Sequence, residues 1–198
     1  MVRILIRTVL LVVITLSLAL LAGCSGVSGD PYQQANGYVA EANEAINEHN
    51  ALFEEARGTY EEAKEAMEEA GESGSEDASE GTDAQLEEIT QARETMQEAR
   101  DTLEEAREPL SEVQDLDVED EITRYATLLS EGVDAQITAE NREIGFYELL
   151  EQDPTLADNR EEAEEILTEV ADGYEEAENS YARAQELANA NPELLQEG

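Results

Sequence analysis

Cys24 carries the most nucleophilic side chain of this 198-residue chain and is its only cysteine. One chain can therefore form neither a disulfide nor a thiolate metal cluster. Upstream lie Arg3, Arg7 and an apolar run over residues 8–20, followed by small residues directly before the cysteine. A cationic start, a short apolar segment and small residues at a cleavage point are the layout of an export signal. The apolar run is shorter than the ~20 residues that span a bilayer comfortably, which favours cleavage.

The residues Leu21, Ala22, Gly23 and Cys24 resemble the lipobox of bacterial lipoproteins. The resemblance implies that the first three are recognition positions, and that Cys24 receives a diacylglyceryl group and becomes the new N-terminus after residues 1–23 are removed. Several acyl chains, palmitate among them, would then anchor the protein to the extracytoplasmic face of a bacterial membrane, since each buried CH₂ contributes ~0.8 kcal/mol. The alternative is an uncleaved membrane anchor with an incidental cysteine.

Two further residues invite a chemical interpretation. His49, the only histidine, has Ile46 three residues before it, where a di-iron helical bundle would need glutamate. We interpret His49 as a packed or rim residue and not as a ligand. Glu140 falls on the apolar face of another predicted helix, where we expect its carboxylate to reach water and not to bind a ligand.

A calcium loop is suggested by the alternating acids Asp115, Asp117 and Glu119. However, Asp120 and Ala126 stand where such a loop needs glycine and glutamate. We therefore predict no catalytic residue, no dedicated metal site and no cofactor besides the covalent lipid on Cys24, and we do not expect an enzyme.

The charge balance restricts the partners. The sequence has 50 acidic against 11 basic residues and a net charge of −39 at pH 7. Contacts to phosphate need Lys and Arg, so nucleic acid is excluded as a partner. Anionic lipid headgroups repel such a surface, so membrane association must depend on the lipid at Cys24. Like-charge steps, as from Glu61 to Glu65 and Glu69, cost ~0.2–0.5 kcal/mol each, so salt or loosely associated divalent cations should stabilise the fold.

The elements that must position these residues are helices, because alanine, glutamate and leucine dominate and tryptophan is absent. We expect four long helices, over about residues 31–70, 82–113, 118–151 and 154–191. Asp30-Pro31 and Asp153-Pro154 each have the form of a helix start, with a capping Asp and Pro at the first helical position. Pro109 should kink the second helix or end it early.

Three of these helices carry a seven-residue repeat of a large apolar residue followed three positions later by a small one, and we call these two positions the seam. The seam residues of the first helix are Val39, Ile46, Phe53, Tyr60 and Met67 with Ala42, His49, Ala56, Ala63 and Ala70. Those of the second are Ile89, Met96, Leu103 and Leu110 with Ala92, Ala99, Ala106 and Val113, and those of the fourth are Leu167, Tyr174, Tyr181 and Ala188 with Val170, Ala177 and Ala184. The third helix is expected to bury Ile122, Ala126, Leu129, Val133, Ile137, Ile144 and Tyr147.

The repeat predicts an all-α fold, an elongated antiparallel helical bundle or a set of coiled-coil hairpins. In this organisation, residues 24–30 form a flexible tether, residues 31–191 form the bundle and residues 192–198 form a frayed tail. Residues 71–81 combine glycine, serine and acids without a large apolar residue, which predicts a disordered acidic loop.

The spacing of Tyr174, Ala177, Tyr181 and Ala184 is similar to that of the second helix of a tetratricopeptide repeat. Glutamates stand where the first helix of that repeat has its characteristic residues, so we attribute the spacing to a shared need for close helix packing. The predicted function is a lipid-anchored spacer, scaffold or interaction module, working with an envelope partner or by self-association. The alternative is a small-molecule-binding bundle for transport or sensing, with a cavity between Phe53, Tyr60, Tyr174 and Tyr181.

Overall fold

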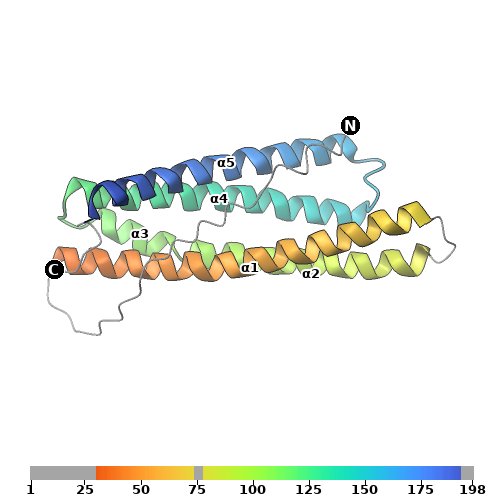
Figure 1. Cartoon of the computed structure of the whole chain (residues 1–198), viewed down its shortest axis with the longest axis horizontal. Coiled ribbons are helices and arrows are strands. Elements are labelled where there is room, and N and C mark those ends of the chain that lie inside the picture. Colours follow the sequence, from red (N-terminus) through yellow and green to blue (C-terminus); the bar gives the residue numbers. More distant parts are fainter. Residues whose placement is uncertain (1–29, 74–77, 193–198) are drawn as a thin grey trace.

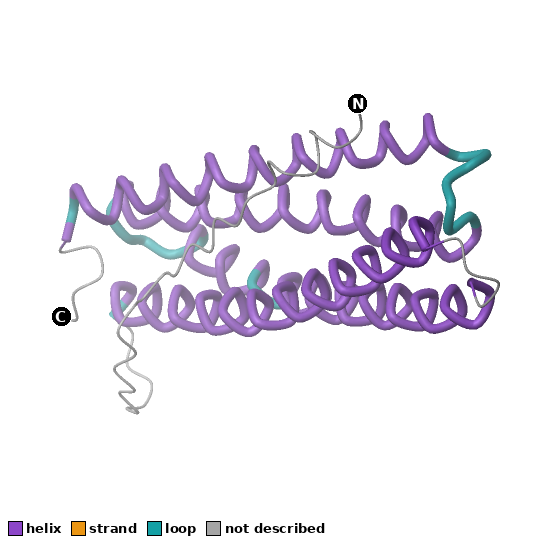
Figure 2. Tube along the Cα trace, turned by 45° about the vertical axis from the view of Figure 1, so that its right-hand side comes forward, coloured by secondary structure: helices purple, strands orange, loops and turns teal. Residues whose placement is uncertain are grey.

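The computed structural model describes residues 30–73 and 78–192, and it confirms the all-α helical bundle (Figure 1). Its helices are α1 (Pro31–Ser73), α2 (Ala78–Glu104), α3 (Arg107–Gln114), α4 (Asp120–Gln152) and α5 (Arg160–Ala190). The short α3 continues the direction of α2, so α2 and α3 together form one long segment beside α1, α4 and α5 (Figure 2). The predicted signal peptide, Cys24 and most of the tether lie outside the described residues, as does the tail from residue 193.

The helices form two antiparallel hairpins, one of α1 with α2 and α3, the other of α4 with α5. The two hairpins pack lengthwise, with α2 and α3 against α4 (Figure 1). The 43 residues of α1 give it a length of about 65 Å at ~1.5 Å per residue. No helix within the described ranges combines the length and apolar character needed to cross a membrane.

The predicted start of α1 is confirmed, because Asp30 Oδ1 accepts a hydrogen bond from the Tyr32 amide at 3.0 Å. At the other end, α1 runs to Ser73 and α2 begins at Ala78, before the start predicted at residue 82. Helix thus occupies part of the segment predicted as a loop, and residues 74–77 of that segment lie outside the described residues. Alanine and glutamate are strong helix formers, which favours extension of both helices beyond their buried seams.

The predicted effect of Pro109 is also confirmed. Helix α2 ends at Glu104 and α3 begins at Arg107. Proline has no amide hydrogen, and its ring collides with the carbonyl of the residue four positions earlier, here Glu105, so a continuous helix is disfavoured at that point. Leu110 and Val113 of α3 are nevertheless buried, so α3 continues the apolar seam of α2.

The start predicted for the last helix at Pro154 is wrong, because α5 begins at Arg160 (right end of Figure 2). The Asp153 carboxylate instead organises the preceding loop, accepting hydrogen bonds from the Asp158 amide at 3.0 Å and the Thr155 hydroxyl at 3.1 Å. These hydrogen bonds, that from Asp158 foremost, hold the pKa of Asp153 below its usual value. Leu156 in the same loop has a φ of 50°, a left-handed conformation that is costly for a leucine.

The core follows the predicted seam in α1, α2, α3 and α4. All the residues expected to be buried on α4 are buried, as are the described small seam residues of α1 and all seam residues of α2 and α3. The seam predicted for α5 is partly wrong, because Leu167 is 36% exposed. The prediction is confirmed at Val170, Ala177, Ala184 and Ala188, which are buried, and Ala163 and Ser180 complete this buried stripe of small residues.

Two glycines show how closely α4 and α5 approach. A Cβ added at Gly132 of α4 would lie 2.6 Å from Cε1 of Tyr181, and one at Gly173 of α5 would lie 2.9 Å from Cβ of Ala139. Both distances are too short for a real Cβ contact, so neither position accepts a side chain unless its neighbours move. The α4–α5 contact thus depends on small residues on the stripe of α5 and on glycine on both helices.

Candidate functional site

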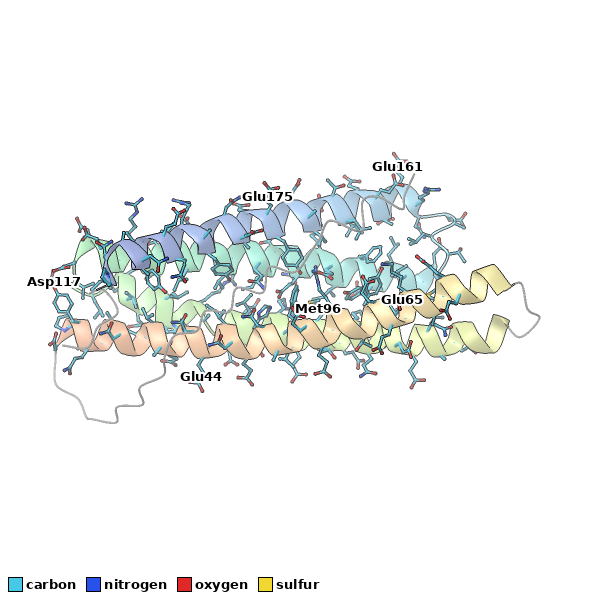
Figure 3. All side chains as sticks on the ribbon, viewed as in Figure 1. Glu44, Glu65, Met96, Asp117, Glu161 and Glu175 are labelled. Atoms are coloured by element: carbon cyan, nitrogen blue, oxygen red, sulfur yellow. The ribbon has the colours of Figure 1, made fainter. Side chains whose placement is uncertain are left out.

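A group of polar side chains interrupts the apolar core between the two hairpins, and we call it the buried polar layer. Its members are His49 and Arg57 of α1, Gln136, Glu140, Glu143 and Tyr147 of α4, and Tyr174 and Tyr181 of α5. Most charged residues lie elsewhere: Figure 3 shows Glu44 and Glu175 on opposite outer faces of the molecule, with Met96 between them. Charges placed inside the bundle therefore require a specific explanation.

The first half of the layer is a chain of hydrogen bonds that joins α5, α4 and α1. Tyr181 donates its hydroxyl to Gln136 Oε1 at 2.9 Å, and Gln136 Nε2 donates to Glu140 Oε1 at 3.1 Å. The same carboxylate oxygen lies 2.7 Å from His49 Nε2. The second oxygen, Oε2, has no hydrogen-bond partner among the described residues.

The expectation that Glu140 reaches water is therefore wrong, because both Glu140 and His49 have no exposed surface. The physical reason is that α1 supplies an imidazole at the level of the carboxylate, so the charge finds a partner inside the bundle. The interpretation of His49 as a packed residue is confirmed, and its other ring nitrogen lies 3.2 Å from Asn50 Oδ1.

The second half of the layer is centred on Glu143, which accepts hydrogen bonds from all three helices. Arg57 of α1 donates to Oε2 at 3.0 Å and Tyr174 of α5 donates to the same oxygen at 2.6 Å. Tyr147 of α4 donates to Oε1 at 2.8 Å. The Arg57 guanidinium also lies 4.5 Å from the centre of the Phe53 ring and 4.9 Å from that of Tyr174, within cation–π range.

Burial sets the protonation of the phenols in this layer. It raises the pKa of Tyr147 and of Tyr174 well above the usual value, and the negative charge of Glu143 raises both further. Burial likewise raises the pKa of Tyr181, with Glu140 adding to the effect. Burial alone lowers the pKa of Arg57, but the charges and the hydrogen bond around it, those of Glu143 foremost, together outweigh burial and the net direction is upward. The phenols therefore remain protonated donors and Arg57 remains a cation.

The chemistry available to the layer is the mutual recognition of charged and polar groups across three helices. In the part of the chain that the structure describes, no three His, Cys, Asp or Glu side chains converge to hold a metal ion. The aromatic residues considered as cavity walls contact one another or their neighbours: Phe53 meets Tyr174 at 5.7 Å between ring centres, and Tyr60 meets Tyr147 at 5.0 Å. Those contacts disfavour an open cavity between these rings.

Sequence reasoning identified His49 and Glu140 singly but did not pair them, and it missed Arg57, Gln136 and Glu143. Two local signals were available: His49 stands at a small seam position where every other described residue of α1 is alanine, and Glu140 stands on the apolar face of α4. Gln136 and Glu143 each stand beside the predicted stripe of α4 and interrupt no repeat. Their partners are far away in sequence, so no local pattern reveals them.

A second set of charged contacts joins the hairpins near the surface. Arg93, Arg100 and Arg107 stand seven residues apart along α2 and α3 and contact α4, through Glu151 at 2.8 Å, Asn141 at 2.9 Å and Asp134 at 2.7 Å respectively. Within the α4–α5 hairpin, Arg142 pairs with Glu169 and Arg183 pairs with Glu131. Much of the scarce basic charge is thus used between helices.

No protein-family model, curated protein or solved structure matches this chain. Its function is therefore inferred from the first residues of the sequence and from the geometry of the bundle.

Proposed function

We propose that the protein is a lipid-anchored helical spacer or scaffold on the extracytoplasmic face of a bacterial membrane, where its outer faces contact a partner in the cell envelope. The lipobox-like residues 21–24 support the anchor. They stand close before α1, which begins at Pro31. A lipid on Cys24 would hold this end of the bundle at the membrane and leave the α1–α2 and α4–α5 connections at the distant end (Figure 1).

The observation that carries the proposal is the long, closely packed interior. Two apolar clusters, one containing Ile46 and Leu110 and the other Met96 and Leu150, fill the space between the helices on either side of the buried polar layer. The molecule therefore offers length and an outer surface to other molecules. The small-molecule-binding alternative has less support, because the rings proposed to line its cavity contact each other.

The outer surface also limits the chemistry of a partner. Along α1, exposed glutamates recur every seven residues, at Glu41, Glu48, Glu55, Glu62 and Glu69. A protein that binds this face must supply basic residues, and divalent cations can associate loosely with it. Such a face is repelled by anionic lipid, which supports a role for the bundle in standing away from the bilayer.

The test compares three forms of the full chain in bacterial cells: the wild type, Cys24→Ala and the neighbouring control Ser25→Ala. Cells are fed a labelled fatty acid, fractionated and treated with a cross-linker before pull-down. The wild type and Ser25→Ala should carry the label, sediment with membranes and capture the same envelope protein. Cys24→Ala should lose all three properties. Equal labelling and membrane association of Cys24→Ala would contradict the anchor, and self-cross-links alone would contradict an envelope partner.

A further inference from the structure

We infer that the buried polar layer sets the register of the two hairpins, so that α1 docks against α4 and α5 at one level only. This role is independent of the lipid anchor. It rests on the repeat of apolar residues along the helices, on the polar residues that depart from this repeat, and on the burial of His49, Glu140 and Glu143.

The apolar seam alone does not define one register. Along α1, Val39, Ile46, Phe53, Tyr60 and Met67 are all large, and the described residues three positions after them are alanine except for His49. Sliding α1 by seven residues, about 10 Å at ~1.5 Å per residue, would again place large side chains at large positions and alanine at most small positions. A repeated seam therefore tolerates a slip, as in coiled coils whose register needs a polar residue to fix it.

The buried polar layer breaks this equivalence. A slip of α1 by seven residues would bring Ala42 or Ala56 to the level of His49. Glu140, which has no exposed surface, would then lose its imidazole partner, and Oε2 of this carboxylate already has no hydrogen-bond partner within residues 30–73 and 78–192. The same slip would separate Arg57 from Glu143 and bring Asn50 or Lys64 to its level, so the loss at Glu140 is the one common to both directions. In either slipped arrangement Glu140 would keep only the Gln136 amide as a donor. Removal of one partner from a buried pair is strongly destabilising, so the slipped arrangements are disfavoured.

The α4–α5 hairpin positions its own members of the buried polar layer through contacts that do not involve α1. Tyr181 of α5 orients Gln136, and Tyr174 of α5 together with Tyr147 holds Glu143. The contacts left for α1 to complete are those of His49 with Glu140 and of Arg57 with Glu143. Both lie on one helix and must be satisfied at once, which makes the docking level unique.

The test separates specificity from stability by using H49L/E140L, which replaces both buried polar groups by leucines of similar volume. Such replacements usually leave stability unchanged or raised, whereas removal of one partner lowers it. In the full chain carrying Cys24→Ser, two spin labels are attached at Glu55→Cys on α1 and Thr138→Cys on α4, both exposed positions. Pulsed electron paramagnetic resonance then measures the distribution of distances between the labels.

The labelled parent should give one narrow distance peak. H49L/E140L should melt at a higher temperature than H49L alone, although the Gln136 amide loses both partners of its Nε2, and should give a broadened distribution or additional peaks. H49L alone should melt at a lower temperature. The control R107Q/D134N, which removes an exposed pair between the same two hairpins, should keep the single peak.

Three outcomes would overturn the inference. A single unchanged peak in H49L/E140L would show that the seam fixes the register without the layer. Failure of this variant to fold, or a melting temperature lowered by as much as the two single changes together, would make the layer a source of stability and not of specificity. Equal broadening in the control would show that any weakened contact between the hairpins permits slippage.

Discussion

In the α1–α2 hairpin both helices contribute large and small side chains in alternation, whereas in the α4–α5 hairpin the large side chains come mainly from α4 and the small ones from α5. In the first hairpin α1 buries Ala42 and Ile46, and α2 buries Ala92 and Met96. In the second, Ala177 and Ala184 form part of the stripe on α5. Two helices with the same seven-residue repeat can therefore pack in two ways: large side chains of each helix fit against small ones of the other, or small residues let the two backbones approach closely.

The largest expected effect comes from truncating one large seam residue in each hairpin. Met96→Ala should lower the free energy of unfolding by ~2–5 kcal/mol, because Met96 has no exposed surface and its loss leaves a cavity. Leu167→Ala, at the corresponding large position predicted for α5, should change it by less than ~0.5 kcal/mol because Leu167 is exposed. Denaturant unfolding measures both, and equal losses would contradict the assignment of the α5 stripe.

Matched glycine substitutions sharpen the comparison between close approach and open space. Gly132→Ala should destabilise the fold by ~1–3 kcal/mol, because its Cβ would meet the Tyr181 ring. Gly58→Ala on α1 has nothing within 4 Å of its Cβ and should stabilise the fold by ~0.5–1 kcal/mol, since alanine is the better helix former. Thermal melts of both variants measure these changes in stability. A change of the same sign in both variants would contradict the close approach of α4 and α5.

Alkaline pH should act mainly on the α4–α5 hairpin, which holds Tyr125, Tyr147, Tyr174 and Tyr181, whereas the α1–α2 hairpin holds one phenol of raised pKa, Tyr60. Burial raises the pKa of Tyr125 to about 12 and raises the pKa values of the other three as well. Because each folded-state pKa exceeds the unfolded value near 10.0, this stabilisation is complete below pH ~10 and is lost as the pH rises toward the folded-state values. Unfolding free energies measured from pH 8 to 12 should fall only above about 10.

Tyr174→Phe provides the control for that pH dependence. It removes one buried phenol and should make the decline above pH ~10 shallower, at the cost of one hydrogen bond to Glu143 at neutral pH. An unchanged slope would show that Tyr174 does not contribute to the alkaline loss.

Salt should have the smallest effect per contact. Exposed glutamates in series, such as Glu61, Glu65 and Glu69 of α1, repel one another by ~0.2–0.5 kcal/mol per step, and ions screen this repulsion. The melting temperature followed by circular dichroism should rise with ionic strength, and with a divalent salt at lower concentration. A flat melting temperature would contradict this expectation.

Much of the fold could be predicted because its signals are local. The repeat that includes Ile46, Met96 and Leu110 encodes which faces are buried, and Pro109 encodes the break between α2 and α3 through its own covalent geometry. The start of α5 was predicted wrongly because Asp153 can cap a loop as well as a helix. Only the contacts that follow it select between the two.

The helical fold, the acidic surface and the seven-residue repeat follow from the sequence alone, because helix propensity, charge and heptad spacing are properties of neighbouring residues. Only the tertiary structure decided that His49 meets Glu140, 91 positions away, and that Arg57 meets Glu143. The packing of α5 also adds Ala163 and Ser180 to the buried stripe and leaves Leu167 exposed. These outcomes depend on which helices become neighbours and at what level, and that choice is made by packing and by the cost of burying charge without a partner.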